Sequence, residues 1–136
     1  MTEALIVMIG SERCAVPMER VIEVWRYDGA TRIPGSPEWV CGIVDRAGTP
    51  VEVIDAARRI GVPRTGSGAH PCLLFFTARS RWTAAMLVDD VDRLVAVRRS
   101  DSRTALPRAV VLDVLDDDGA AVPLLDVDAL FEEEHA

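Results

Sequence analysis

The residues of this 136-residue chain that could do chemistry together are two aspartates, one in each half. Asp55 ends the segment GTPVEVID and Asp126 ends GAAVPLLD, so both segments fit Gly-x-x-Val-x-apolar-apolar-Asp. Two carboxylates that meet at a pseudo-twofold axis could share a proton and act as an acid–base dyad. Each aspartate also directly precedes a short helix-like stretch, where its carboxylate can accept the unpaired N–H groups of the first turn. The Asp-Thr/Ser-Gly loop of aspartic proteases is absent, so we expect two helix caps.

No other group of residues indicates a catalytic or metal site. His70 and His135 have no acid or thiol partner at a characteristic spacing. The three cysteines lie far apart without a Cys-x-x-Cys pair, which argues against a zinc or redox motif. The acidic run 116–118 lacks the ligand spacing and the closing glutamate of a calcium loop, and segment 66–68 lacks the lysine of a phosphate-binding loop. We therefore expect a non-enzymatic protein with no cofactor and no metal ion.

Composition and charge narrow the class of protein further. The formal net charge of −7 argues against nucleic acid as a partner, because phosphate binding needs a clustered positive surface. The apolar run ALIVMI at 4–9 is far shorter than a membrane span, and no secretory signal precedes it. We expect a soluble cytoplasmic protein that does not insert into the membrane.

The elements that must position these residues repeat once along the chain. Residues 18–24 (MERVIEV) align with residues 88–94 (VDDVDRL), which matches Val21 to Val91 and Val24 to Leu94. Each half therefore carries this segment first and a Gly-x-x-Val segment later. A period of roughly seventy residues is too long for a solenoid and suits two small β units that share a core.

Short apolar runs between turn residues predict about nine or ten strands and two short helices. The predicted strands are 4–9, 13–16, 21–25, 39–44, 49–54, 72–77, 82–88, 91–98, 109–115 and 120–125. We expect helices at 56–60 and at the end of the chain through residue 131, a helical turn at 18–20, and turns at 46–48, 78–81 and 116–119. Frequent turns favour a sandwich or barrel, and two echoed halves favour two barrels.

Taken in order, these segments resemble the CheW-like family of chemotaxis coupling domains over nearly the whole chain. The most diagnostic segment, IPGSPEWVCGIVDRAGTPVEVID, resembles Leu-Pro-x-x-Pro followed by Gly-Ile/Val-x-Asn-x-Arg-Gly-x-x-x-Pro-Val-Ile-Asp-Leu. The opening IVMIGSERCAVPMERVIEV, the later MLVDDVDRLVAV and the closing PLLDVDALF resemble the family as well. Asp45 replaces the usual Asn, Ala47 replaces the usual Arg, and Arg46 stands one place earlier. A one-place shift in a tight turn directs a side chain differently, so we look for altered coupling at 46–48.

The resemblance implies a mainly β fold of two five-stranded SH3-like barrels that share a hydrophobic seam, with a few short helices. Residues 1–136 would form a single CheW-like domain made of two interleaved barrel subdomains. The family is non-enzymatic. It couples the cytoplasmic tip of methyl-accepting chemoreceptors to the regulatory domain of the histidine kinase CheA, at membrane-associated receptor arrays.

By the same resemblance we assign partner contact to Val21, Glu23, Ile33, Pro34, Arg46, Ala47 and Gly48, with Val88 and Asp89 in the seam. Each position has a purely structural alternative: the apolar residues could be core, Pro34 and Gly48 could only form turns, and Glu23 could be a solvated residue. Three other functions stay open for the whole chain. It could be a scaffold in a twitching or regulatory pathway, a hydrolase that uses the two aspartates, or a structural β module.

Overall fold

The computed structural model of the chain describes residues 2–63, 70–77 and 83–132. The strands are β1 (Thr2–Ile9), β2 (Glu12–Pro17), β3 (Val21–Arg26), β4 (Val40–Arg46), β5 (Thr49–Asp55), β6 (Cys72–Thr77), β7 (Thr83–Val88), β8 (Asp90–Arg99), β9 (Val111–Asp117) and β10 (Ala120–Leu125). The helices are α1 (Ala56–Ile60) and α2 (Val127–Phe131), with 3-10 turns η1 (Met18–Arg20) and η2 (Arg108–Val110). The predicted turn at 78–81, the segment 66–68 and His135 lie outside the described residues.

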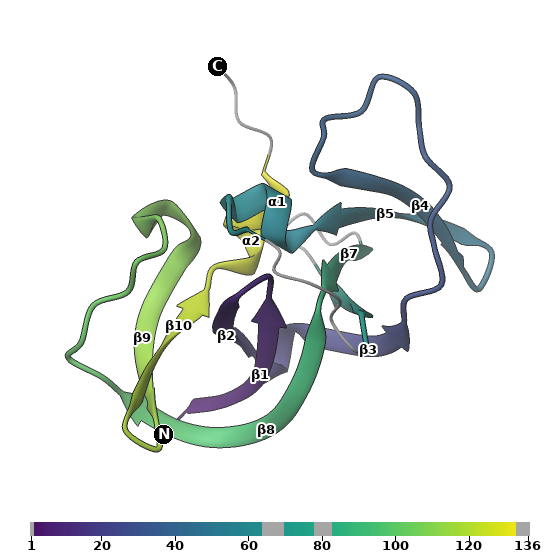
Figure 1. Cartoon of the computed structure of the whole chain (residues 1–136). Helices are drawn as coiled ribbons and strands as arrows, with labels where there is room; N and C mark the ends of the chain where they lie inside the picture. Colours follow the sequence, from purple (N-terminus) through teal and green to yellow (C-terminus); the bar gives the residue numbers. More distant parts are fainter. Residues whose placement is uncertain (1, 64–69, 78–82, 133–136) are drawn as a thin grey trace.

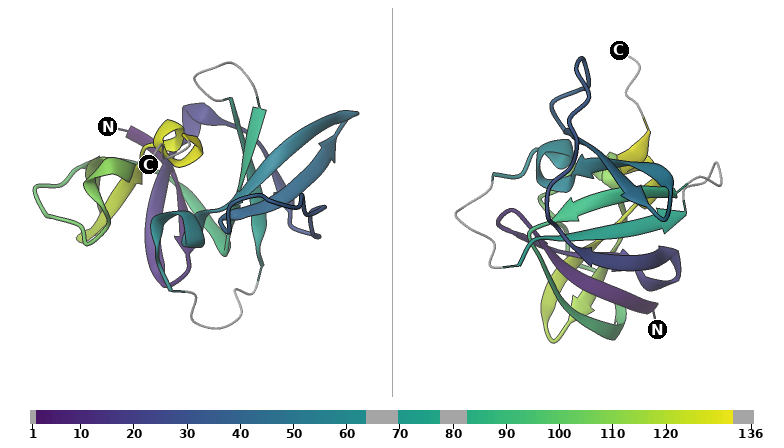
Figure 2. Two further views of the ribbon diagram at one scale, coloured as in Figure 1. Left: turned by 90° about the horizontal axis from the view of Figure 1, so that it is seen from above. Right: turned by 90° about the vertical axis from the view of Figure 1, so that its right-hand side faces the viewer.

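The strands form two five-stranded sheets with the same internal order. The first sheet, β8-β1-β2-β10-β9, closes into a barrel because β8 pairs with both β1 and β9. The second sheet has the order β3-β6-β7-β5-β4. Along the chain, β3 follows β2 but joins the second sheet, and β8 follows β7 but joins the first. Figure 1 shows the two groups of strands side by side, with α1 and α2 next to each other between them, and Figure 2 shows the same arrangement from above and from the side. The predicted fold, mainly β with two five-stranded units and a few short helices, is confirmed.

The second sheet is closed by a loop rather than by strand pairing. Its edge strands are β3 and β4, and the segment after β3 crosses to β4 at Thr31. The N–H of Thr31 donates to the carbonyl of Ile43 at 2.9 Å, and the N–H of Ile43 donates back at 2.8 Å. Gly42 makes this approach possible, because a Cβ there would lie 2.2 Å from the Thr31 carbonyl oxygen and its φ is +144°.

The sequence repeat extends to the irregularities of the strands. A β-bulge leaves Ile22 of β3 without a partner residue, and another leaves Asp92 of β8 without one. These two residues are related by the spacing that relates Val21 to Val91. Bulges at Cys41 of β4 and Leu112 of β9 are likewise related by the spacing between the two Gly-x-x-Val segments. The two halves therefore share backbone geometry well beyond the residues that match in sequence.

The two hairpin turns are also equivalent, and both are shorter than predicted. Arg46 pairs with Thr49 and Asp117 pairs with Ala120, so each turn has only two central residues. Ala47 and Gly48 have φ of +51° and +86°, and Asp118 and Gly119 have +53° and +88°. Two positive φ values define the type I′ turn, whose twist matches that of the flanking strands. This match extends β4 and β9 by two residues each, so that β4 reaches Arg46 of the turn predicted at 46–48 and β9 reaches Asp117 of the turn predicted at 116–119.

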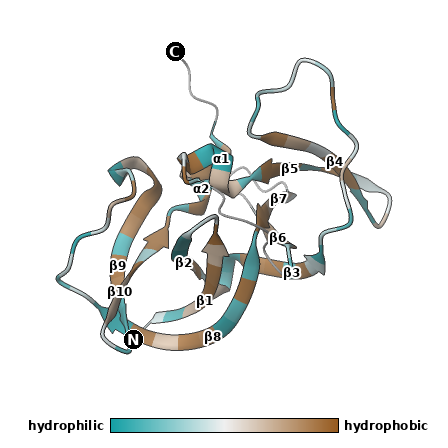
Figure 3. Cartoon of the chain, viewed as in Figure 1, coloured by the Kyte–Doolittle hydropathy of each residue, from teal (hydrophilic) through white to brown (hydrophobic). Residues whose placement is uncertain are grey.

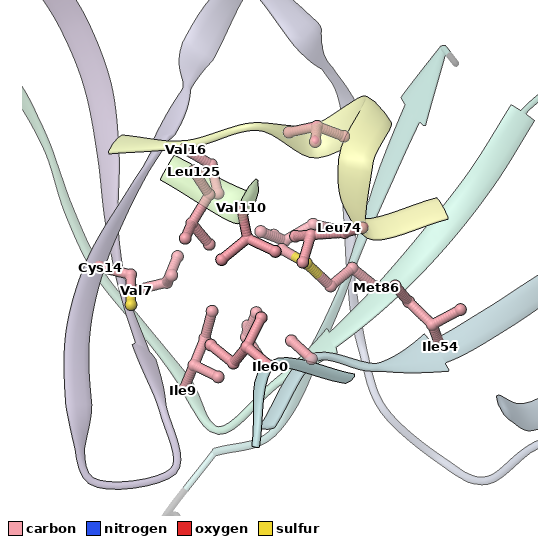
Figure 4. Packing of buried hydrophobic residues seen from close by; sticks show 14 of the residues in the cluster. Val7, Ile9, Cys14, Val16, Ile54, Ile60, Leu74, Met86, Val110 and Leu125 are labelled. Carbon is pink, nitrogen blue, oxygen red and sulfur yellow. The ribbon is translucent and has the colours of Figure 1, made fainter. Parts of the chain in front are cut away.

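Three apolar clusters hold the sheets together. One cluster fills the interior of the first barrel, and one covers the inner face of the second sheet. The largest cluster lies in the seam between the two sheets. β1 contributes to two of them, with Val7 and Ile9 in the seam and Ile6 in the barrel, which explains its unbroken apolar sequence. Figure 3 shows apolar stretches along β1, β9 and β10, and Figure 4 shows side chains of β1 and β2 facing Leu74 and Met86 across the seam. The seam that the family resemblance implied is therefore present.

The segment before β9 differs from the prediction. Residues 109–115 were expected as one strand, but residues 108–110 form the 3-10 turn η2. The turn carries Val110 into the seam core, where it joins Leu106 of the preceding loop. Burial of these two side chains takes precedence over local strand propensity.

Candidate functional site

Glu23 and Arg46, two of the predicted partner-contact residues, are in direct contact. The Nε–H of Arg46 donates to Oε1 of Glu23 at 2.9 Å. The pair joins β3 to β4, the two edge strands of the second sheet, and its side chains are 43% and 30% exposed respectively. The bulge at Ile22 allows this contact, because it places Glu23 opposite Phe75 of β6. The guanidinium carbon of Arg46 also lies 5.6 Å from the centroid of the buried Phe75 ring.

The hairpin tip beside this ion pair is exposed. Ala47 and Gly48 both face solvent, and Ala47 adopts a left-handed conformation that costs an L-residue free energy. The methyl group of Ala47 can offer a partner neither charge nor a hydrogen bond, so Arg46 carries the only guanidinium of this turn. Its side chain is directed toward Glu23 across the sheet edge.

Ile33 and Pro34 lie on the loop between β3 and β4, and both are exposed. The Ile33 side chain is 36% exposed, and its carbonyl accepts the N–H of Ser36 in a tight turn. A core role for Ile33 is therefore ruled out.

Val21, the first residue of β3, is half-buried and packs on the seam cluster.

Val88 and Asp89 lie in the seam. Val88 is fully buried in the seam cluster. Oδ1 of Asp89 accepts the N–H of Gly10 at 2.8 Å, and the Asp89 N–H donates to the carbonyl of Met8 at 2.8 Å. Asp89 thereby fixes the β1–β2 turn of the first sheet to the end of β7 in the second sheet. This turn also touches Pro63, whose carbonyl accepts the N–H of Ser11.

Three exposed apolar residues near these positions were not predicted as contacts. Ile22 and Val24 of β3 are each 44% exposed, and Leu94 of β8 is 52% exposed. Val24 pairs with Leu74 and Leu94 pairs with Leu5.

Because Leu74 and Leu5 belong to the seam cluster, Val24 and Leu94 lie on the seam side of their strands. They form matching apolar edges, which we call the seam rim, and Ile22 adjoins the rim on β3. The sequence could have indicated Val24 and Leu94 as equivalent positions, since the repeat aligns one with the other. Exposed apolar side chains gathered at one place are typical of a protein–protein contact.

The other half carries the counterpart of the Glu23–Arg46 pair with its charges reversed. The repeat relates Glu23 to Arg93 and Arg46 to Asp117. Nη2 of Arg93 donates to both carboxylate oxygens of Asp117, at 2.7 and 2.8 Å. This hydrogen bond raises the pKa of Arg93 above its ordinary value. Asp117 is nearly buried and also lies 3.7 Å from Arg13, so its charge is neutralised within the chain.

Asp55 and Asp126, which end the two repeated segments, are helix caps, as predicted. The carboxylate of Asp55 accepts the N–H groups of Ala57 and Arg58, and that of Asp126 accepts the N–H of Ala129. In the acidic run, Asp116 accepts the N–H of Gly119 within the turn.

Within 2–63, 70–77 and 83–132, no three His, Cys, Asp or Glu residues are grouped so that they could hold a metal ion. None of the helices described in this chain combines the length and the apolar character needed to cross a membrane.

Comparison with known proteins gives one consistent result. The family model described as the CheW-like domain matches residues 3–135. The chain is 26% identical to a probable chemotaxis protein CheW of Rhizobium etli over 96% of its own length and 88% of the relative's. It is 20% identical to the chemotaxis protein CheW of Bacillus subtilis over 96% and 86% of the two lengths.

A solved structure agrees with these relatives. The crystal structure of the scaffolding protein TtCheW from Thermoanaerobacter tengcongensis superposes with a TM-score of 0.86. It is 21% identical in sequence, and the match covers 97% of this chain and 93% of that one. At this identity the likeness supports the fold, and the family assignment rests on the match over residues 3–135.

Proposed function

The chain belongs to the CheW-like domain family, and from this membership we propose that it is a non-enzymatic adaptor of chemotaxis signalling. In this role it couples the cytoplasmic tip of methyl-accepting chemoreceptors to the regulatory domain of the histidine kinase CheA. Its place of action is the cytoplasm, at receptor arrays. Two relatives named chemotaxis protein CheW and a neighbour named scaffolding protein support this assignment.

The observation that carries the proposal is the seam rim. Val24 and Leu94 expose apolar surface at equivalent positions of β3 and β8, on both sides of the seam between the sheets. A receptor tip is a helical hairpin, and an amphipathic helix binds by laying its apolar face on exposed apolar surface of a partner. Glu23 follows on the other face of β3, where it contacts Arg46 at the edge of the second sheet, and these exposed charges can select the orientation of the partner.

Coupling also requires a second surface and a firm connection between the two surfaces, since each partner must bias the other through the chain. We assign the second surface to a barrel end, where the CheW-like domain of the kinase would dock. The continuous seam cluster supplies the connection, because its residues come from both sheets. The hydrogen bond from Gly10 to Asp89 adds a polar link across the same seam.

The turn at Ala47 favours a second candidate within the same class. The family's usual Arg would add a mobile cation at this exposed tip, and Ala47 removes it. Such a loss fits a chain that serves a different receptor and kinase, in a twitching or regulatory pathway built from the same parts. The fold and the adaptor role are the same under both candidates, and only the partners differ.

Binding to defined partners tests the proposal. The full chain is co-sedimented with receptor signalling-tip fragments and, separately, with CheA. We expect both to bind, and we expect Val24→Ser to weaken the receptor arm. Leu112→Ser is the matched control, because Leu112 is 58% exposed near the start of β9, whereas β9 pairs with β8 only through Leu115 and Asp116. Failure of the wild-type chain to bind either partner would exclude the adaptor role, and equal loss in both variants would exclude the rim as the contact.

A further inference from the structure

Arg20 connects the two sheets through one guanidinium. It is the last residue of η1 and directly precedes β3. Its Nη1 and Nη2 donate to the two carboxylate oxygens of Asp128, at 3.1 and 2.7 Å. Nη2 also donates to the carbonyl of Thr77 at 2.8 Å. Asp128 lies in α2, which follows β10 of the first sheet, whereas Thr77 ends β6, the neighbour of β3 in the second sheet.

Helix α2 depends on such contacts because it has only five residues. A helix this short is not stable by itself in water. Val127 and Leu130 bury its inner face in the seam cluster, and the ring of Phe131 lies 6.1 Å from that of Phe76 in β6.

The end of α2 is held by the other helix. The guanidinium of Arg59 in α1 donates to the carbonyls of Ala129, Leu130 and Glu132, at 3.1, 3.0 and 3.1 Å. These carbonyls would otherwise be unpaired at the end of the helix. The Arg59 guanidinium also lies over Trp39, 5.1 Å from the ring centroid. One arginine thus fixes the end of α2 to α1, while Arg20 fixes its beginning to β3 and β6.

The Arg20–Asp128 contact is better shielded than the exposed ion pair between Arg99 of β8 and Asp113 of β9. Its side chains are 29% and 11% exposed, compared with 79% and 35% for Arg99 and Asp113. Two hydrogen bonds between charged groups in a partly buried place are strong and fix the geometry. The hydrogen bond to Asp128 also raises the pKa of Arg20.

We propose that the Arg20–Asp128 pair makes α2 a latch that sets the position of β3, the strand that carries Val24 of the seam rim and Glu23 of the ion pair with Arg46. When the pair is intact, α2 of the first sheet and β3 of the second sheet move together. When it is broken, β3 loosens at its first residues while the barrel of the first sheet is unchanged. The consequence for receptor binding rests on the proposed function, whereas the latch rests on contacts within the chain.

Hydrogen exchange on the full chain tests the latch without any partner. Arg20→Gln and Asp128→Asn should each speed exchange of the α2 and β3 amides by about tenfold or more, as expected for loss of a charged hydrogen bond. The effect of the double variant should be clearly smaller than the sum of the two single effects, because both single variants remove the Arg20–Asp128 contact. Asp113→Asn breaks the exposed Arg99–Asp113 pair and should leave β3 unchanged.

Three exchange results would overturn the latch: unchanged β3 in both single variants, equal acceleration in all strands, or additive effects in the double variant. A second arm measures binding of the same variants to a receptor signalling-tip fragment, where weaker binding by Arg20→Gln and Asp128→Asn is expected. If the wild-type chain does not bind the fragment, the proposed function fails and the exchange data still decide the latch. If binding falls while β3 exchange stays normal, Arg20 acts by another route and the latch is wrong.

Discussion

Arg46 holds Glu23 across the edge of the second sheet, with 2.9 Å between Nε and Oε1. The contact stands where the first sheet has Arg93 and Asp117, so one position of the repeat carries opposite charges in the two halves. Glu23 is next to Val24 of the seam rim in sequence but lies on the opposite face of β3, and both charges of its pair with Arg46 are partly exposed. An ion pair at this place can stiffen the sheet edge and select a partner at the same time.

Glu23→Lys separates these two roles. Exposed ion pairs contribute little to folding, so we expect the free energy of unfolding in urea to fall by less than about 1 kcal/mol. Receptor binding should weaken clearly, because a lysine facing Arg46 reverses the charge of the strand. A loss of several kcal/mol in stability would instead make the pair a structural clamp.

Gly42→Ala should be much more harmful than Gly48→Ala. A Cβ at Gly42 would lie 2.2 Å from the Thr31 carbonyl, whereas a Cβ at Gly48 meets no atom within 4 Å. Both residues have positive φ, so Gly48→Ala should cost only the backbone strain of about 1–2 kcal/mol. Gly42→Ala should exceed that cost, since the loop that closes the second sheet must move. Equal midpoints in urea denaturation would show that this closure contributes nothing.

Asp55→Ala should cost about 1 kcal/mol of stability, as expected for loss of a helix cap. The variant leaves the N–H groups of Ala57 and Arg58 without their carboxylate partner. Asp55→Asn keeps an acceptor oxygen and should retain most of the stability. Thermal unfolding of both variants measures the difference, and an alanine variant as stable as wild type would contradict the cap.

Cys14 makes stability depend on pH in the alkaline range. The thiol is fully buried, and burial raises its pKa to about 12 from 9.0. The folded protein therefore keeps a proton that the unfolded chain releases, so the stabilising term is complete below pH 9 and is lost as pH rises toward 12. Between these values the wild type should lose about 1.4 kcal/mol per pH unit more than Cys14→Ala. Parallel profiles in urea titrations from pH 9 upward would contradict this assignment.

The sequence predicts the strands well where periodicity and burial agree. β1 is apolar without interruption because it faces the seam on one side and the barrel on the other. The Gly-x-x-Val repeat predicts two equivalent hairpins with capped helices, and both are present. The length of the turns is harder to predict, because Ala47 gives no hint of the positive φ that the type I′ turn imposes on it.

Contacts between the two sheets cannot be predicted from the periodicity or the repeat of the sequence. Nothing near Asp89 in sequence indicates that its carboxylate accepts the N–H of Gly10. The two residues meet because β3 leaves the first sheet to join the second and β8 leaves the second to join the first. The exposure of Val24 and Leu94 has the same origin. Apolar residues in strands are normally read as core, and only the open edge of the seam leaves these two in solvent.

CheA kinase activity tests the adaptor role most directly. Receptor signalling-tip fragments and CheA are mixed at fixed concentrations, and autophosphorylation is followed as the full chain is titrated. A coupling adaptor should make kinase activity depend on the receptor only when the chain is present, and Val24→Ser should shift the titration to higher concentration, whereas Leu112→Ser should not. Kinase activity that does not respond to the chain at any concentration, although both partners are active with their own adaptor, would contradict the account.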